Sequence, residues 1–238
     1  MKKNRVVAVA GAGPGLGASV ARRFAKEGYT AALVARTQSK LEEIQNEIEA
    51  LGQCALPFTA DLTSEKELER VFHEISEKAG TIDVLVYNAG DFKMQSLLDI
   101  DPEGFKRSWE INCLGAFLCS KLALPPMIEN KRGTIIFTGA TASKRGSAMF
   151  ARLAVGKFGL RALAQSMARE FGPKGIHVTH VVIDGQIATP FYLETQPERD
   201  PRTLLSPESI AEQYWQLHLQ GRTSWTLELD LRPSVEKF

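Results

Sequence analysis

The chain has few cysteines, no long apolar run and no excess of charge of either sign. Its 238 residues include three cysteines, and 29 Lys and Arg nearly balance 28 Asp and Glu, for a formal net charge of +1. Three scattered thiols argue against a secreted disulfide scaffold and suit a reducing compartment. Balanced charge argues against a nucleic-acid partner. The apolar run 6–10 is too short for a signal peptide or a membrane span. We therefore expect a cytoplasmic protein that contacts no membrane.

The four histidines are scattered, so we expect no metal site. His177 and His180 are the only close pair, and they lie three residues apart in a predicted strand. Side chains at that spacing point to opposite faces of a strand, so the two imidazoles cannot share one ion.

Short β-branched runs alternate with longer amphipathic stretches along the chain. The predicted strands are 6–9, 31–35, 55–60, 84–87, 134–138, 177–183 and 225–231. The predicted helices are 16–26, 41–51, 64–79, 105–129 (one helix or two), 151–171 and 207–219. This alternation predicts one α/β domain over 1–238, a Rossmann-type doubly wound parallel sheet with helices on both faces. Such sheets bind ligands beyond the carboxyl ends of their strands.

A glycine-rich loop follows the first predicted strand and leads directly into a helix. Glycines here let the backbone approach a pyrophosphate at the positive helix N-terminus. The loop fits two spacings, G-x-G-x-x-G/A from Gly13, and G-x-x-x-G-x-G from Gly11. The backbone expected to face a dinucleotide belongs to Gly11, Gly13, Gly15, Leu16 and Gly17.

The end of the second strand indicates which dinucleotide binds. An acidic residue there would bind a ribose hydroxyl, whereas an arginine would accept a 2′-phosphate. The sequence has Arg36 and Thr37 and no carboxylate. A guanidinium is a planar fork suited to phosphate, so NADP(H) is favoured over NAD(H), although Arg36 is also compatible with an ordinary solvated arginine.

Taken together, these motifs resemble those of the short-chain dehydrogenase/reductase family over nearly the whole chain. The resemblance rests on the glycine loop, on the Asp61-Leu62 pair, and on further matches at Asn88, Ala89, Gly90, Asn112, Lys157, Gly185 and Thr189. It implies that Asn112 and Lys157 belong to the catalytic centre and that the remaining residues, with Lys157, hold the cofactor. It also implies a substrate lid at about 190–206, and a homodimer or homotetramer formed through the long central helices.

The catalytic centre departs from the family pattern. The family places a tyrosine four residues before the lysine, and this chain has Leu153 there. The longer spacing of related enoyl reductases leads to Phe150, and the family serine position is Ala140. Both hydroxyls of the usual proton-transfer pair are therefore missing. Because general acid–base catalysis contributes about 10²–10⁴-fold, hydride transfer need not be abolished, but ordinary carbonyl reduction should be slowed.

Four other residues are weak substitutes for the missing acid. They are Tyr87, Thr141, Ser143 and Asp184. For Thr141 and Ser143 the simpler interpretation is turn chemistry, and for Tyr87 it is a core ring.

Two functional hypotheses follow from the sequence. The first is an NADP(H)-dependent oxidoreductase that acts on a small carbonyl or alcohol substrate with a non-standard proton donor. The second is a catalytically silent NADP(H)-binding sensor or partner subunit.

Overall fold

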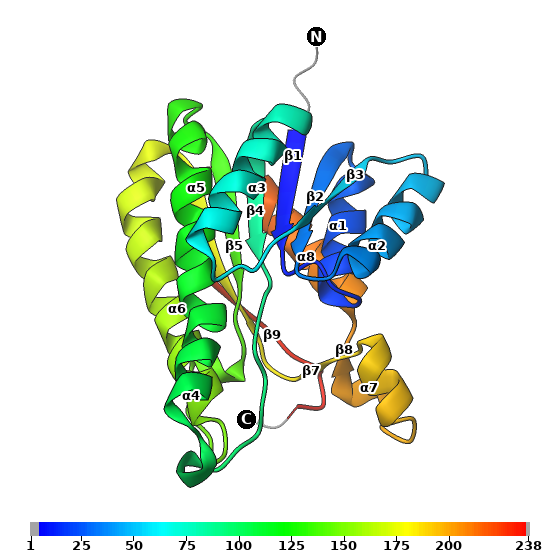
Figure 1. Ribbon diagram of the computed structural model, residues 1–238, viewed down its shortest axis with the longest axis vertical. Coiled ribbons are helices and arrows are strands. Elements are labelled where there is room, and N and C mark those ends of the chain that lie inside the picture. Colours follow the sequence, from blue (N-terminus) through cyan, green and yellow to red (C-terminus); the bar gives the residue numbers. More distant parts are fainter. Residues whose placement is uncertain (1–4, 237–238) are drawn as a thin grey trace.

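The computed structural model describes residues 5–236, which form a seven-stranded parallel sheet between two layers of helices (Figure 1). The strand order is β3-β2-β1-β4-β5-β6-β9. The strands are β1 (Arg5–Ala10), β2 (Tyr29–Ala35), β3 (Ala55–Thr59), β4 (Ile82–Tyr87), β5 (Gly133–Thr138), β6 (Ile176–Ile183) and β9 (Glu228–Leu231). This order confirms the predicted fold class, and each predicted strand is present within a few residues of its expected bounds.

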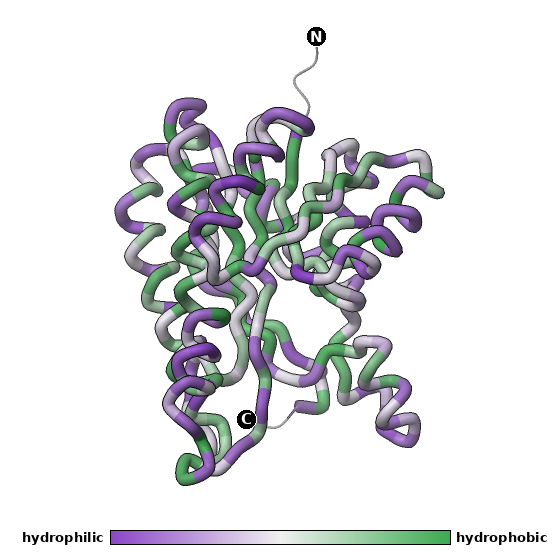
Figure 2. Tube along the Cα trace, viewed as in Figure 1, coloured by the Kyte–Doolittle hydropathy of each residue, from purple (hydrophilic) through white to green (hydrophobic). Residues whose placement is uncertain are grey.

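Alternate residues of the central strands feed two separate cores. Val6 and Ala8 of β1 pack on the side of α3 (Glu65–Lys78), α5 (Gly115–Glu129) and α6 (Ala151–Phe171). Val7 and Val9 pack on the side of α1 (Leu16–Ala25), α2 (Gln38–Ala50) and α8 (Pro207–Leu219). Because a strand presents successive side chains to opposite faces, a strand between two helix layers must be apolar throughout. Figure 2 shows this as hydrophobic colouring along the central strands and hydrophilic colouring on the outer turns of the helices.

The stretch predicted as one helix or two is a helix pair joined by a wider turn. Helix α4 (Pro102–Trp109) and α5 are linked by a π-helical segment, Glu110–Leu114. The run Pro102–Glu129 is the one described stretch long and apolar enough to cross a membrane by length and composition, but half of its most apolar window is buried in the fold. Helix α5 packs on β4 and β5, which accounts for its apolar composition.

The segment expected to form a lid has structure of its own. It contains α7 (Pro190–Thr195) and β8 (Leu204–Leu205), and β8 pairs with β7 (Gln186–Ile187) in a small separate sheet. Figure 1 shows α7 at the lower right, beyond the carboxyl edge of the main sheet. The resemblance implied a lid at this segment but not its secondary structure, and the short pairing with β7 is a long-range contact that the local sequence did not reveal.

Candidate functional site

A pocket lies at the carboxyl edge of the sheet, where the loops after β1, β2, β3 and β4 meet. Most of the residues predicted from the sequence to bind cofactor at these loops line it: Gly11, Gly13, Arg36, Thr37, Asp61, Leu62, Asn88, Ala89 and Gly90. The start of α1 adjoins this pocket, with Gly15 as N-cap, no side-chain cap and no acidic residue in the first turn. Free amide groups at such a helix end are suited to a phosphate. The arrangement therefore fits a dinucleotide.

The structure distinguishes between the two glycine spacings that fit the loop after β1. Gly11 has φ +93°, and a Cβ on it would lie 2.5 Å from the backbone nitrogen of Ala89. A Cβ on Gly17 would lie 2.6 Å from the Gly11 carbonyl oxygen, whereas a Cβ on Gly13 meets nothing within 4 Å. The G-x-x-x-G-x-G spacing from Gly11 is therefore the one that the backbone requires. The side chain of Leu16, the residue before Gly17, is buried in the core beneath the loop.

The loop after β6 approaches the glycine loop where Thr189 lies beside Gly15. Gly15 has φ +106°, and a Cβ there would lie 2.8 Å from the methyl carbon of Thr189. Gly185 lies earlier in the same loop, and a Cβ on it would meet Leu205 at 2.9 Å and Pro233 at 3.0 Å. Thr189 is therefore beside the glycine loop, while Gly185 lies where the chain leaves β6 toward residues 190–206.

One end of the pocket is strongly basic. Arg36 and Thr37 connect β2 to α2, with Thr37 as the N-cap, and Lys40 lines the same pocket in the first turn of α2. Within residues 5–236 the side chains of Arg36 and Lys40 make no hydrogen bond and no ion pair, and the Thr37 hydroxyl does not cap the helix. The sequence analysis missed Lys40, although its spacing of four from Arg36 is the signal that would have found it.

Asp61 belongs to a polar cluster that the sequence does not reveal. Its carboxylate accepts hydrogen bonds from Arg107 at 2.6 Å and from the Thr63 hydroxyl and backbone amide at 2.8 and 2.9 Å. Burial raises the pKa of Asp61, but these bonds from Thr63 and Arg107 outweigh it and hold the pKa below its usual value. Arg107 lies on α4, 46 residues away, and no local motif predicts the pairing.

Lys157 and Asn112 meet behind Gly90, at the inner end of the pocket. A Cβ on Gly90 would lie 3.4 Å from Asn112 Oδ1 and 3.6 Å from Lys157 Nζ. Asn112 is in the π-helical segment, and its amide nitrogen donates to the carbonyl oxygens of Ser108 at 2.9 Å and Asp91 at 3.2 Å. The two residues that the family resemblance placed in the catalytic centre are therefore adjacent, and the π turn is what brings Asn112 there.

The ammonium of Lys157 is buried with one hydrogen-bond acceptor. Nζ donates to the Thr138 carbonyl oxygen at 2.9 Å, and the residue is 5% exposed. Burial lowers the pKa of Lys157 from 10.5 to about 8, and the nearby Cys113 thiol raises it slightly. A buried charge with so few partners costs stability, and such groups concentrate at functional sites.

An apolar cluster fills the place where the resemblance expects two hydroxyl groups. Leu153, Ala142 and Ala154 are buried together, with Ala140 and Phe150 packed against them. Leu153 and Ala140, the residues at the family tyrosine and serine positions, are therefore neighbours in one cluster. No hydroxyl takes their place within this cluster.

The four substitute acids are all engaged elsewhere. The Thr141 hydroxyl donates to Asp184 at 2.5 Å, and Arg232 lies 3.4 Å from the same carboxylate. The Ser143 hydroxyl is buried and accepts from the Ala140 amide. Tyr87 is a core ring whose hydroxyl donates to the Ile111 carbonyl oxygen at 2.6 Å.

The two neighbouring histidines lie on opposite faces of β6, as their spacing predicts. His177 stacks on Trp225 at a centroid distance of 5.0 Å, while His180 contacts Glu228 at 3.2 Å. Burial lowers the pKa of His180 to about 4, although Glu228 opposes this effect. His180 is therefore neutral near pH 7.

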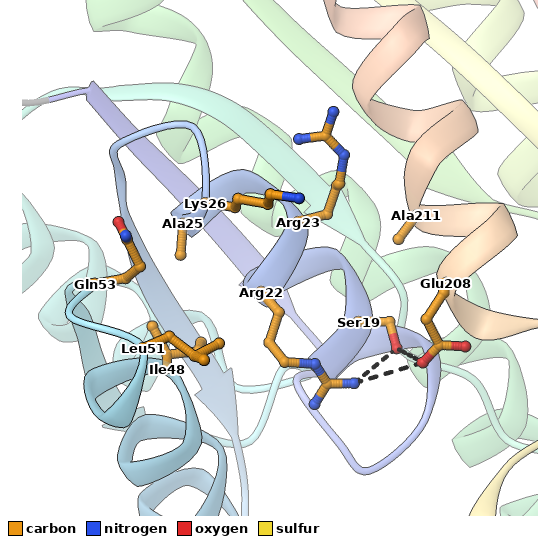
Figure 3. A pocket seen from close by; sticks show the side chains of 10 residues that line it. All are labelled: Ser19, Arg22, Arg23, Ala25, Lys26, Ile48, Leu51, Gln53, Glu208 and Ala211. Carbon is orange, nitrogen blue, oxygen red and sulfur yellow. Dashed lines mark hydrogen bonds and ion pairs between the residues drawn. The ribbon is translucent and has the colours of Figure 1, made fainter.

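A second hollow lies between α1, α2 and α8 and shares no lining residue with the edge pocket (Figure 3). Arg22 and Arg23 border it, but Arg22 pairs with Glu47 at 2.7 Å and Arg23 with Glu212 at 2.5 Å. The two guanidinium groups are thus already neutralised, and the residues with cofactor and catalytic character lie at the carboxyl edge instead.

Comparison with known proteins agrees with this geometry. The family model described as short chain dehydrogenase matches residues 5–200. A short-chain dehydrogenase/reductase of Armillaria gallica is 37% identical over 81% of this chain and 74% of its own length. The crystal structure of a short-chain dehydrogenase from Rhodopseudomonas palustris has 36% identity and a TM-score of 0.84, covering 97% of this chain and 99% of that one. A metagenomic short-chain oxidoreductase in complex with NADP has 27% identity and a TM-score of 0.83, covering 98% of each chain. The chain belongs to the short-chain dehydrogenase/reductase family.

The loop geometry predicts that Gly11→Ala abolishes dinucleotide binding and lowers the melting temperature. The added methyl group would collide with the turn after β4, at a backbone angle that L residues rarely adopt. Gly146→Ala is the matched control, because its methyl group enters open space and the residue does not line the pocket. Thermal unfolding and NADPH fluorescence titration measure both effects, and equal behaviour of the two variants would contradict the assignment.

The buried ammonium predicts that Lys157→Met stabilises the fold by roughly 2 kcal/mol at pH 7, because the cost of the lowered pKa exceeds the lost hydrogen bond. The pKa of Lys157 is lower in the folded state than in the unfolded state. Burying the ammonium therefore destabilises the fold fully below pH 8, progressively less between about 8 and 10.5, and not at all above that range. Urea unfolding at several pH values measures it, with the exposed Lys66→Met as control. If Lys157→Met were less stable than the unaltered protein at pH 7, the buried ammonium would not be destabilising.

Proposed function

We propose that the protein is an NADP(H)-dependent oxidoreductase acting on a small carbonyl or alcohol substrate, with Lys157 in the role of proton donor. One observation carries the proposal. The pocket lined by the glycine loop and a buried lysine with a lowered pKa lie at the same edge of the sheet. Family membership supports the oxidoreductase class. The silent-sensor hypothesis has no structural feature in its favour beyond the apolar cluster at Leu153.

The basic end of the pocket supports a preference for NADP(H). Arg36, Lys40 and the uncapped start of α2 would surround a 2′-phosphate with charge and donors. The similar metagenomic oxidoreductase was solved with NADP, which agrees with this preference. The glycine loop and the start of α1 would hold the pyrophosphate, with Thr189 packed against Gly15.

The chain's own residues would manage the proton. When bound, NADPH supplies the hydride to the carbonyl carbon. The carbonyl oxygen then gains the π electron pair and takes a proton from Lys157 Nζ, leaving a neutral amine that water reprotonates. In the oxidation direction the neutral amine would accept the alcohol proton.

Elimination among neighbouring groups supports Lys157 as this donor. The Thr141 and Tyr87 hydroxyls donate to protein oxygens, and the Asp184 carboxylate accepts from Thr141. Ser143 has no exposed surface, whereas Lys157 keeps 5%, and His180 is neutral. Lys157 has two N–H groups beyond the one that bonds Thr138. A pKa of about 8 also lies close to neutral pH, where an acid is most effective.

We also propose that the protein assembles into a homodimer or homotetramer through the α4–α6 side. Exposed apolar side chains gather on these helices: Trp109, Phe117, Val155 and Phe158. Exposed apolar patches of this kind mark association surfaces.

If Arg36 binds the 2′-phosphate, Arg36→Ala should weaken NADPH binding about 10–100-fold and leave NADH binding unchanged. This range corresponds to the loss of a hydrogen bond to a charged group. The exposed Lys66→Ala is the control for general loss of positive charge. Isothermal titration calorimetry with both cofactors measures the ratio. Equal affinities for NADPH and NADH in the unaltered protein would overturn the role of Arg36.

The proton-donor role predicts that carbonyl reduction is constant below pH 8 and declines above it, as Lys157 loses its proton. Lys157→Ala should lower kcat about 10²–10⁴-fold, and added methylamine should restore part of it. Lys157→Arg retains the charge but cannot give up a proton near neutral pH, so it should also lose activity. Its side chain leaves no cavity for methylamine, so no rescue is expected. A Lys157→Ala rate within twofold of the unaltered enzyme would rule the role out.

A further inference from the structure

Exposed apolar side chains border the inner end of the dinucleotide pocket. We call Phe92, Met94, Met149 and Phe150 the apolar rim. Phe92 and Met94 are each 63% exposed and Met149 is 44% exposed, although all three are large hydrophobic residues. Apolar side chains grouped in this way at the surface mark ligand grooves or interaction sites.

The rim is continuous with the reaction site at both ends. Phe92 follows Asp91, which lines the dinucleotide pocket and exchanges backbone hydrogen bonds with the Asn112 amide. Phe92 meets Phe150 with ring centroids 5.6 Å apart. Phe150 in turn packs on the buried cluster around Leu153. The rim therefore extends outward from the residues that surround Lys157.

A partly buried ion pair connects the two loops that carry the rim. Arg152 is 8% exposed, and it donates to the Asp91 carboxylate at 2.7 Å and to the Gln95 side chain at 3.2 Å. The Gln95 amide also donates to the Met149 carbonyl oxygen at 2.8 Å. Rigid support of this kind pre-orders a surface and lowers the entropy lost when a ligand binds.

Met149 is held in a backbone conformation that methionine rarely adopts. Its φ of +70° makes it one of two non-glycine residues with positive φ within residues 5–236. Such strain persists where the surrounding structure requires it, and it gathers at binding sites. Here it fixes the backbone that carries an exposed thioether side chain, one residue before Phe150.

We propose that the apolar rim binds the aryl or bulky alkyl group of the substrate, so that the substrate is a hydrophobic ketone or its alcohol. The inference rests on the proposed function and narrows it to one substrate class. Aromatic and thioether side chains suit a flat or branched apolar group. The Arg152 guanidinium behind the rim is engaged through its two terminal nitrogens with Gln95 and Asp91, and its Nε is buried, so Arg152 itself does not reach a ligand on the rim.

Steady-state reduction of 2-acetylnaphthalene and hydroxyacetone by NADPH tests the inference. Phe92→Ala and Met149→Asn each remove a rim side chain, and asparagine tolerates the positive φ at 149. Each variant should lower kcat/KM for 2-acetylnaphthalene roughly tenfold, mainly through KM, and leave hydroxyacetone unchanged. The matched control is Leu98→Ala, which removes a side chain that is 94% exposed on the same loop but outside the rim.

Ligand binding provides a readout independent of turnover. Saturation-transfer NMR should detect 2-acetylnaphthalene on the NADP⁺ complex, and Phe92→Ala should weaken the signal while NADP⁺ affinity stays the same. If 2-acetylnaphthalene binds in a rim-dependent way but neither ketone is reduced, the proposed function is overturned, while the apolar rim is supported as a binding site for hydrophobic ligands.

Other outcomes would overturn the rim alone. They are a kcat/KM for hydroxyacetone equal to or above that for 2-acetylnaphthalene, or rim variants that alter only the sedimentation of the protein. The latter result would assign the rim to contact between copies of the chain.

Discussion

The whole site depends on the close approach of the glycine loop to the turn after β4. Gly11 packs so tightly against Ala89 that no side chain fits between them, and the Asn88 amide nitrogen donates to the Gly11 carbonyl oxygen at 3.1 Å. This contact joins neighbouring parallel strands at their carboxyl ends, where α1 begins. It also places Gly90 against Lys157, so one packing constraint connects the dinucleotide pocket to the buried ammonium.

The second constraint is chemical. A lysine buried with one carbonyl acceptor destabilises the protein, and the cluster around Leu153 supplies no hydroxyl to share its protons. In a purely structural role, an apolar side chain would serve better at this position. A buried lysine at this position fits the role that we propose for it, in which the ammonium binds the cofactor and exchanges a proton near neutral pH. The apolar cluster and the rim beyond it then favour a substrate that brings hydrophobic surface to the same place.

Most of the fold could be predicted from the sequence because its signals are local. Alternating β-branched and amphipathic stretches defined the seven strands and the main helices, and the glycine loop located the edge pocket. The features that escaped prediction depend on long-range contacts. Arg107 binds Asp61, which is 46 residues away in the chain, and Arg152 binds Asp91, which is 61 residues away. Strand β7 pairs with β8, which lies beyond α7 in the chain. The π turn at Asn112 likewise has no local signature, since an asparagine within a helix has several common explanations.

The titration of the Lys157 amine, followed by NMR of ¹⁵N-labelled lysine side chains in the NADP⁺ complex, tests the central claim most directly. The account predicts one lysine with a pKa near 8, whose resonance is absent from Lys157→Met. If every lysine resonance, including that of Lys157, titrates above pH 10, the ammonium is not desolvated in the cleft and the account of the proton donor is contradicted.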